Sequence, residues 1–319
     1  MIKFKHLCCL GIFLVGISAF GCTKTFYIKD PSPSSVVYSE KSQEELTLKI
    51  NDRRSGEDKK LSEGTLPVVL VNMEDEISFL GANLQTALIS RGINLHYSSD
   101  ADGGLVIDVD KYRIRNLRTS GFSPYWTFTT FSGELKHNGD SHRVVFYFKR
   151  GKVPVWAFRE VEDPCYNVPV SLMVKEVASK INRFYFGLQA SDDKIRSLVD
   201  DINNQFDEFS FLKVLELGYT NNPAAIEPLV ALTNHDDSMV RVCATCSLGV
   251  LGAVDQFDYL KQLYNTKENI EKTMALKAIG DLGTPEAIEF IQTIKASPDY
   301  KDKMIREVVD LFILESGES

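Results

Sequence analysis

Cys243 and Cys246 stand three positions apart, which is the spacing of a redox-active cysteine pair. Such a pair normally lies at a helix N-terminus, where the helix dipole lowers the pKa of a thiol. Both cysteines instead fall a turn or more inside a predicted helix, at positions of small residues. The sequence therefore favours packing of two small apolar side chains over redox chemistry.

His137 and His142 flank an Asn-Gly pair and can meet across a hairpin, but two imidazoles without a third ligand make a poor zinc site. No Gly-rich phosphate loop, serine elbow or metal-protease helix occurs in the sequence. Acidic residues are abundant, yet no pair of them is singled out for acid–base work. We therefore expect a non-enzymatic protein with no catalytic residue, no metal and no cofactor.

A row of basic residues is the strongest cluster in the sequence: Lys111, Arg113 and Arg115, with Arg118 nearby. Strand alternation places the first three on one face, where they repel one another unless an anion compensates. Three interpretations remain open. The row is a solvated outer face, a site for a phosphate-bearing or peptidoglycan-like ligand, or a docking surface for the acidic C-terminal part of the chain.

Aromatic residues gather in the next strand, at Tyr125, Trp126, Phe128 and Phe131. Alternation puts Tyr125 and Phe131 opposite Trp126 and Phe128, so both faces of the strand carry aromatic rings. One face covers the helices. The other is a candidate apolar binding face, for a partner protein or for a ligand in a small groove.

The elements that carry these residues alternate between strands and helices up to residue 190. Period-two or β-branched patterns predict strands, and apolar residues every three to four positions predict two helices. The predicted strands are 46–50, 66–71, 105–109, 125–135, 144–148 and 153–158, and the predicted helices are 77–92 and 170–188. The expected fold is an α+β two-layer domain, an antiparallel sheet with two helices on one face.

This order resembles that of the YajG-like family of small bacterial lipoproteins. The resemblance rests on a strand ending in Asn51-Asp52-Arg53-Arg54, a helix ending in Arg91-Gly92, a strand meander and a closing helix. It covers about residues 22–190 and implies a fold but no catalytic residue.

The remaining residues repeat with an offset of 31. Ala244, Leu248, Gly249 and Gly252 match Ala275, Ile279, Gly280 and Gly283, and the preceding helices obey the same offset. The stretch from Asp236 to Gly249 resembles a HEAT repeat of the short, lyase-like type. An all-α HEAT-like solenoid is therefore expected from residue 191 onward, about four helix pairs long. The resemblance implies that Asp236 and Arg241 link neighbouring repeats.

The first residues form a secretory signal, with Lys3 and Lys5 before an apolar run over 7–20. The cleavage region, ending in Gly21-Cys22, resembles that of a bacterial lipoprotein, which implies that Cys22 carries acyl chains such as palmitate. Thr23 after Cys22 resembles the default for outer-membrane sorting. The following Pro- and Ser-rich stretch is expected to be a flexible tether. The predicted organisation is a signal peptide over 1–21, lipidated Cys22 and tether over 22–45, the α+β domain over 46–190 and the solenoid over 191–319.

Charge is divided unevenly along this organisation. The chain of 319 residues has a net charge of -8, which argues against a nucleic-acid binder. Residues 191–319 alone hold 12 basic and 23 acidic side chains, a net of -11. We expect a cell-envelope protein, anchored by lipid in the outer membrane and facing the periplasm, whose repeats bind unknown partner proteins. The alternative is a ligand-binding envelope module that uses the basic strand and the aromatic face for a lipid, glycan or cell-wall fragment.

Overall fold

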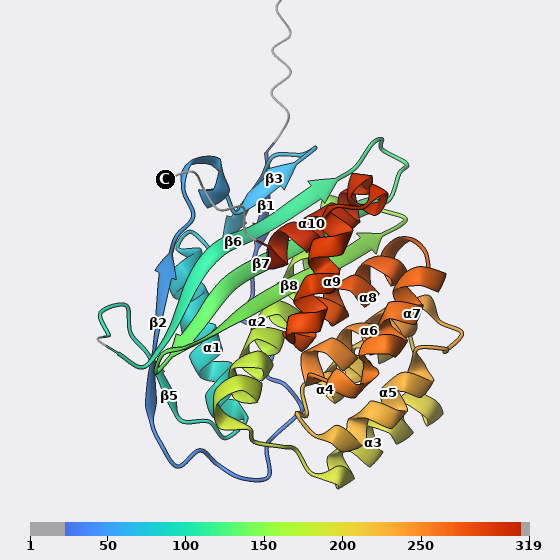
Figure 1. Ribbon diagram of the computed structural model, residues 1–319. Helices are drawn as coiled ribbons and strands as arrows, with labels where there is room; N and C mark the ends of the chain where they lie inside the picture. The colour runs from blue at the N-terminus through green and yellow to red at the C-terminus, as the bar shows by residue number, and fades with distance from the viewer. Residues whose placement is uncertain (1–22, 102, 314–319) are drawn as a thin grey trace, which may run out of the picture.

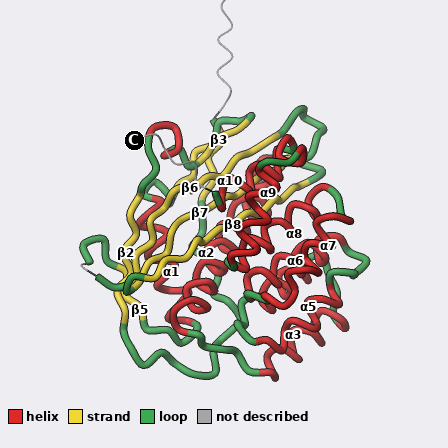
Figure 2. Tube along the Cα trace, viewed as in Figure 1, coloured by secondary structure: helices red, strands yellow, loops and turns green. Residues whose placement is uncertain are grey.

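The computed structural model describes residues 23–101 and 103–313, which form a mixed sheet joined to a stack of helices (Figures 1 and 2). The main sheet has the strand order β5-β2-β6-β7-β8, and β3 also pairs with β6. A separate parallel pair is formed by β1 and β4. The strands are β1 (Lys24–Tyr27), β2 (Leu46–Asp52), β3 (Ser62–Gly64), β4 (Val68–Val71), β5 (Leu95–Tyr97), β6 (Leu105–Leu117), β7 (Tyr125–His137) and β8 (Asp140–Lys152).

The prediction of a purely antiparallel sheet is wrong at one side. β6, β7 and β8 are antiparallel, and Asn138-Gly139 makes the two-residue hairpin that the sequence predicts, with φ of 50° and 89°. β2, however, runs parallel to both β5 and β6. The chain between β2 and β5 includes helix α1 (Glu76–Ser90), and a helical crossover returns the next strand in the same direction. The expected strand at 153–158 is also absent, since β8 ends at Lys152 and a short 3-10 helix, Phe158–Val161, follows.

Two helices cover one face of the main sheet, as the α+β prediction requires. They are α1 and α2 (Val168–Ile181), which pack on each other. Tyr125 and Phe131 lie on this face, which we call the α2 face, and both are fully buried. The opposite face carries Trp126 and Phe128 and is crossed by the last described helix, so we call it the α10 face.

The segment expected to be a flexible tether is instead packed into the fold. β1 pairs with β4, and Ile28, Val36 and Tyr38 are buried. The Ser39 amide donates to the Gln189 carbonyl at 2.8 Å, at the junction of the two regions. The Pro- and Ser-rich composition does favour an extended chain. The apolar side chains before and after it, Ile28, Val36 and Tyr38, are nevertheless buried in the fold. Cys22 itself lies outside the described residues.

From residue 192 onward the described chain is helical and forms successive antiparallel pairs. Helices α4, α6, α8 and α10 pack on one another in order and are called the inner layer. Helices α3, α5, α7 and α9 each pack on one or two inner helices and are called the outer layer. The helices are α3 (Asp192–Asn204), α4 (Ser210–Gly218), α5 (Ile226–Leu232), α6 (Ser238–Leu251), α7 (Phe257–Thr266), α8 (Asn269–Leu282), α9 (Pro285–Lys295) and α10 (Lys303–Phe312).

Glycines at the 31-residue spacing allow the inner helices to approach closely. A Cβ on Gly218 would lie 2.7 Å from Ser247 of α6, and one on Gly249 would lie 2.5 Å from Ala278 of α8. One on Gly280 would lie 2.5 Å from Phe312 of α10. The stops predicted at Gly252 and Gly283 are confirmed, since both end their helices in the left-handed conformation, with φ of 73° and 72°.

The described residues contain no helix whose length and apolar content would allow it to cross a bilayer.

Candidate functional site

Three members of the predicted basic row, Lys111, Arg113 and Arg115, lie on the α10 face of β6, and the two arginines pair with acidic side chains. Arg113 pairs with Asp58 at 2.7 Å and with Glu63 at 3.4 Å. Arg115 pairs with Glu307 of α10 at 2.7 Å, and Lys111 is half-buried. Arg113 and Arg115 are therefore each neutralised by an acidic side chain, and of the basic row only Arg115 has an ion pair with the helical region.

Arg118 belongs to a different environment, the loop between β6 and β7. Its guanidinium donates to the carbonyls of Gly121 and Val155 at 2.5 and 3.4 Å and lies 5.3 Å from the centroid of the Phe158 ring. The four basic residues consequently do not converge on one anion-binding site.

The candidate apolar binding face is covered in the described structure. Tyr125 and Phe131 belong to the core, and the Tyr125 hydroxyl lies 2.5 Å from that of Tyr166. On the α10 face, Phe128 is buried and Trp126 is half-buried. The Lys149 ammonium lies 4.7 Å from the Trp126 ring centroid and 5.7 Å from that of Phe128. Strand periodicity predicts correctly which rings share a face of the sheet. It does not predict that α10 covers the face that carries Trp126 and Phe128.

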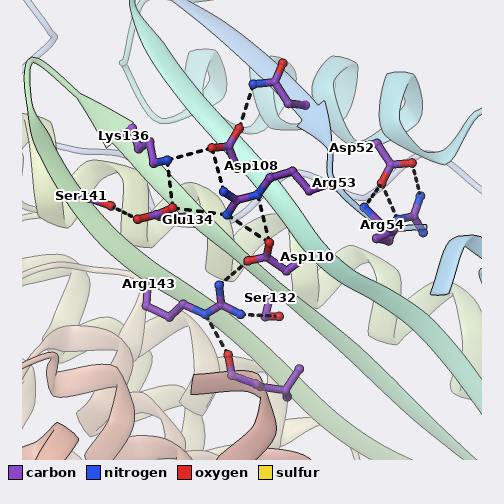
Figure 3. Close-up of polar contacts among 12 residues, drawn as sticks. Asp52, Arg53, Arg54, Asp108, Asp110, Ser132, Glu134, Lys136, Ser141 and Arg143 are labelled. Carbon is purple, nitrogen blue, oxygen red and sulfur yellow. Dashed lines mark hydrogen bonds and ion pairs between the residues drawn. The ribbon is translucent and has the colours of Figure 1, made fainter. Parts of the chain in front are cut away.

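The far end of the α10 face carries a network of charged and polar side chains, the sheet-face cluster. Its members are Arg53, Asp108, Asp110, Ser132, Glu134, Lys136, Ser141 and Arg143 (Figure 3), together with Asn51, which donates to Asp108 at 2.8 Å. Arg53 lies within 3.4 Å of Asp108, Asp110 and Glu134, and the Lys136 ammonium lies 3.0 Å from Asp108 and 2.9 Å from Glu134. Arg54, beside the cluster, pairs with Asp52 and Glu76. Cross-strand neighbours supply these partners, because facing residues of β6 and β7 share one side of the sheet.

Hydrogen bonds in the cluster stabilise its charged forms. Donation by Ser141 and Lys136 lowers the pKa of Glu134 to about 2. Burial opposes ionisation of Asp108, but hydrogen bonds from Asn51 and Lys136 outweigh it and lower the pKa of that carboxyl. The pKa of Lys136 is raised by its bonds to Glu134 and Asp108. Neither carboxyl is therefore tuned for proton transfer near neutral pH.

Arg143 connects the sheet-face cluster to the helical region. Its guanidinium pairs with Asp110, donates to the Ser132 hydroxyl at 2.9 Å and donates to the Leu311 carbonyl of α10 at 2.8 Å (Figure 3). This arrangement neutralises charge within the chain and holds α10 on the sheet. The cluster is best understood as a structural junction.

A second charged group is fully buried between α2 and α8 and forms the interface ring: Glu176, Lys180, Lys277 and Asp281. Lys180 lies 2.8 Å from Glu176 and 2.7 Å from Asp281. Lys277 lies 2.5 Å from Glu176 and 2.7 Å from Asp281. Positive and negative groups alternate, and the Lys180 ammonium also donates to the Val145 carbonyl of β8 at 2.6 Å.

Sequence reasoning missed the interface ring, although a signal exists. Glu176 and Lys180 are four positions apart, as are Lys277 and Asp281, within otherwise apolar helices. Such i,i+4 pairs usually lie on solvated faces, so their burial could not be read from spacing alone. Lys277 also stands 31 positions after Cys246, where the preceding repeat has a small buried thiol.

Arg183, just after α2, binds the ends of two inner helices. It donates to the carbonyls of Gly249 and Val250 at the end of α6, at 2.7 and 2.9 Å, and to the Asp281 carbonyl near the end of α8, at 2.8 Å. Burial lowers the pKa of this guanidinium, although Asp281 and Glu176 oppose the change. A cation at helix C-termini complements their partial negative charge.

The predicted link between repeats through Asp236 and Arg241 is not formed by a pairing of these two side chains, and Arg241 pairs with Glu271 instead. Arg241 donates to the Glu271 carboxylate of α8 from two nitrogens, at 3.1 and 2.6 Å, and thus joins neighbouring helix pairs. Asp236 contributes its backbone carbonyl to Arg241 at 2.7 Å, while the Asp237 side chain caps α6. The helix start at 238 explains the difference, because the residue immediately before it holds the capping position.

The three cysteines that the structure describes, and His142 of the hairpin, occupy packed positions. Cys165, Cys243 and Cys246 are buried and free, and burial raises the pKa of Cys165 and Cys246 to about 12. The His142 ring stacks on Phe184 with centroids 4.1 Å apart. Within residues 23–101 and 103–313, no three His, Cys, Asp or Glu side chains are placed to hold a metal ion.

The outer layer contains a groove of about 420 Å³ between α3 and the start of α5. Its floor is apolar, and exposed carboxylates stand along it. The lining includes Ile195, Val199, Pro228 and Ala231, together with Asp192, Arg196, Asp200, Ala224 and Glu227. A smaller hollow of about 90 Å³ extends it towards Ile202 and Leu232. An apolar floor with an acidic rim suits an amphipathic basic segment.

Comparisons with known proteins find only distant structural likeness. No family model matches the sequence, and no curated protein does. A minor lipoprotein from Acinetobacter baumannii is 15% identical over 46% of this chain and 90% of that chain, with a TM-score of 0.26. An uncharacterized protein is 14% identical over 50% of this chain and 97% of that chain, with a TM-score of 0.28.

Proposed function

We propose that this chain is a non-enzymatic, lipid-anchored protein of the bacterial cell envelope that binds a basic segment of another protein through the groove between α3 and α5. Cys22 is the proposed attachment site for acyl chains such as palmitate, and the outer membrane, facing the periplasm, is the proposed location. In this proposal, residues 46–190 are a YajG-like domain and the helical region is a HEAT-like solenoid.

The HEAT-like interpretation is supported by the stacking of the helix pairs. Gly218, Gly249 and Gly280 recur every 31 residues, and each lies against the next inner helix. The bond between Arg241 and Glu271 joins neighbouring pairs. Repeat proteins of this kind present extended surfaces for binding.

One observation supports the outer layer as the proposed binding surface: α2 covers the inner helices. Lys175 pairs with Glu216 of α4 at 3.4 Å, and the adjacent Glu176 reaches Lys277 of α8 at 2.5 Å. The inner face is thus occupied by the chain's own domain. Residues 191–232, which contain the α3–α5 groove, hold eight acidic and three basic side chains and favour a basic partner.

The groove is tested by site-specific photocrosslinking in bacterial cells that express the full chain. A photoreactive residue at Ala231 is expected to yield a defined crosslinked species, and one at Asp258 on α7, 94% exposed, is not. The double reversal Asp200→Lys with Glu227→Lys should abolish the Ala231 product, while Asp258→Lys should leave it intact. Identical products from both positions, or products insensitive to the double reversal, would exclude the groove.

The lipid anchor is tested separately by palmitate labelling of the wild type and the Cys22→Ala variant. Incorporation only in the wild type supports the anchor, and equal labelling of both refutes it. The alternative, a ligand-binding module, needs the basic strand and the aromatic face to be accessible. Phe128 is buried and Arg115 is paired with Glu307, so these positions offer a ligand little free surface.

A further inference from the structure

Two exposed loops lie together beside the start of β1. They are the β6–β7 loop, residues 118–124, and residues 153–157 after β8. The guanidinium of Arg118 donates to the Val155 carbonyl at 3.4 Å and lies 5.3 Å from the Phe158 ring. The Lys24 ammonium, at the start of β1, lies 4.7 Å from the same ring. Phe158 thus joins both loops to the first described strand.

The tips of these loops expose large apolar side chains. Phe122 is 97% exposed and Trp156 is 83% exposed, and Val153 is also exposed. Isolated apolar residues on a surface are ordinary, but two almost fully exposed aromatic residues on adjacent loops are not. Trp in particular is enriched where proteins meet the headgroup region of a bilayer.

Hydrogen bonds hold both tips in place. The Ser123 hydroxyl accepts from the amides of Thr119 and Ser120 at 3.0 and 2.9 Å and donates to the Ser120 carbonyl at 3.0 Å, which shapes the turn that carries Phe122. The Glu160 carboxylate accepts from the amides of Trp156 and Ala157 at 3.3 and 3.2 Å. The aromatic side chains are therefore presented by ordered turns.

The charge around the tips complements an anionic surface. Residues 23–27, 118–124 and 152–160 hold four basic side chains and one acidic side chain. The basic residues are Lys24, Arg118, Lys152 and Arg159. Cations of this kind strengthen binding to membranes that contain anionic lipids.

The position of the surface along the chain points to a bilayer as its occupant. Only Thr23 separates Cys22 from Lys24, the first residue of β1. Two residues of extended chain reach about 7 Å, so an acylated Cys22 would hold the start of β1 at the membrane surface. Because the segment after β1 is packed, no free tether would let the domain move away.

We propose that Phe122, Val153 and Trp156, with the neighbouring basic residues, form a membrane-contact surface that inserts into the headgroup region and fixes the orientation of the protein on the bilayer. This inference rests on the proposed lipid anchor at Cys22. It assigns the surface to a lipid bilayer containing anionic phospholipid. Penetration is expected to be shallow, as for other interfacial segments.

The chain's two tryptophans make the surface directly testable. In the Trp126→Phe variant, Trp156 is the sole tryptophan. The full chain is produced in bacteria that acylate lipoproteins and is reconstituted in vesicles of phosphatidylcholine and phosphatidylglycerol, with or without brominated phosphatidylcholine as quencher. Emission of Trp156 is expected to shift to shorter wavelength and to fall about two-fold with brominated lipid, since interfacial side chains reach the acyl boundary.

A matched control carries the reporter at the other end of the molecule. Ile89 is exposed and belongs to the last turn of α1. Helix α1 packs on β5, on the opposite side of the molecule from the β6–β7 loop (Figure 1). Ile89→Trp in a background with Trp126→Phe and Trp156→Phe should show no quenching. Phe122→Asp with Val153→Asp, added to Trp126→Phe, should remove most of the quenching of Trp156 without lowering the melting temperature.

Flotation of the vesicles separates the two proposals. Protein that fails to float with vesicles overturns the anchor and the contact surface together. Protein that floats, with Trp156 emission unaffected by brominated lipid, leaves the anchor standing and overturns the contact surface. Equal quenching of the Ile89→Trp reporter also overturns the contact surface, because the bilayer would then contact opposite sides of the protein equally.

Discussion

The Lys180 ammonium lies 2.7 Å from the Asp281 carboxylate, with both side chains 1% exposed, although the two residues are 101 positions apart in the chain. Lys180 belongs to α2 of the mixed-sheet domain and Asp281 to α8 of the helical region. Glu176 and Lys277 complete the alternating ring. The two regions are therefore joined through a buried, charge-balanced contact.

Removing one carboxylate of the interface ring should strongly destabilise the protein. Asp281→Asn leaves two buried ammonium groups with only Glu176 as an anionic partner, and an uncompensated buried charge costs about 3–5 kcal/mol. Urea unfolding should show a correspondingly lower midpoint. The control, Asp258→Asn at an exposed position of α7, should leave the midpoint unchanged. Equal midpoints for the two variants would contradict the prediction.

The same carboxylate should give the stability a defined pH dependence. Burial opposes its ionisation, but Lys180 and Lys277 outweigh burial and lower the pKa of Asp281 below its usual 3.8. Its contribution to the free energy of unfolding is therefore complete above pH 3.8 and is lost as the pH falls through the lower, folded-state pKa. Thermal unfolding of wild type and Asp281→Asn should converge at acidic pH. A difference in melting temperature between wild type and Asp281→Asn that stays constant with pH would contradict the prediction.

Arg183 should be needed to hold α6 and α8 together. Arg183→Met removes the donor to three carbonyls. The Gly249 carbonyl keeps its bond from the Gly252 amide, whereas those of Val250 and Asp281 lose this donor, and each buried acceptor left unpaired costs about 1–3 kcal/mol. Urea denaturation should show a lower free energy of unfolding for Arg183→Met than for the wild type. Arg196→Met, at an exposed site on α3, is the matched control and should unfold like the wild type.

Close approach of α6 and α8 depends on Gly249. A Cβ there would lie 2.5 Å from Ala278 Cα, so Gly249→Ala must push the two helices apart. Overpacking of this kind costs about 1–3 kcal/mol and should lower the melting temperature. Gly121→Ala adds a Cβ with no atom within 4 Å and should have little effect. The interpretation fails if Gly249→Ala melts with the wild type.

The buried thiols should resist modification in the folded protein. Burial raises the pKa of Cys165 and Cys246 to about 12 and that of Cys243 well above its usual value, so the reactive thiolate is scarce at neutral pH. A thiol reagent should label these three residues, identified by peptide mass, only after denaturation. Asp258→Cys supplies an exposed thiol that should react at once. Rapid labelling of Cys246 in the native state would contradict its burial.

Local sequence signals predicted the elements whose geometry depends on nearest neighbours along the chain. The Asn138-Gly139 hairpin forms because those residues tolerate positive φ, and α6 and α8 end at Gly252 and Gly283 for the same reason. Helical periodicity likewise located α1 and α2. The 31-residue offset located the helices that follow, because each repeat has the same apolar positions to bury.

Contacts between distant segments were not predictable in this way. The parallel direction of β2, the packing of Val36 and Tyr38, the cover of α10 over Phe128 and the burial of Lys277 all depend on which elements meet. For residues 30–38 the composition predicted the opposite of what the structure shows. Their prolines and serines are typical of a free linker, yet Val36 and Tyr38 are buried.

The sequence by itself determined the secondary structure of most segments, the change from mixed to helical structure near residue 190 and the uneven distribution of charge. These follow from local backbone preferences and from the period at which apolar residues recur. Only the tertiary structure decided which charges are neutralised inside the protein and which face solvent. The reason is physical: an i,i+4 ion pair has the same sequence whether water or another helix lies against it, and only packing brings Asp281 to Lys180.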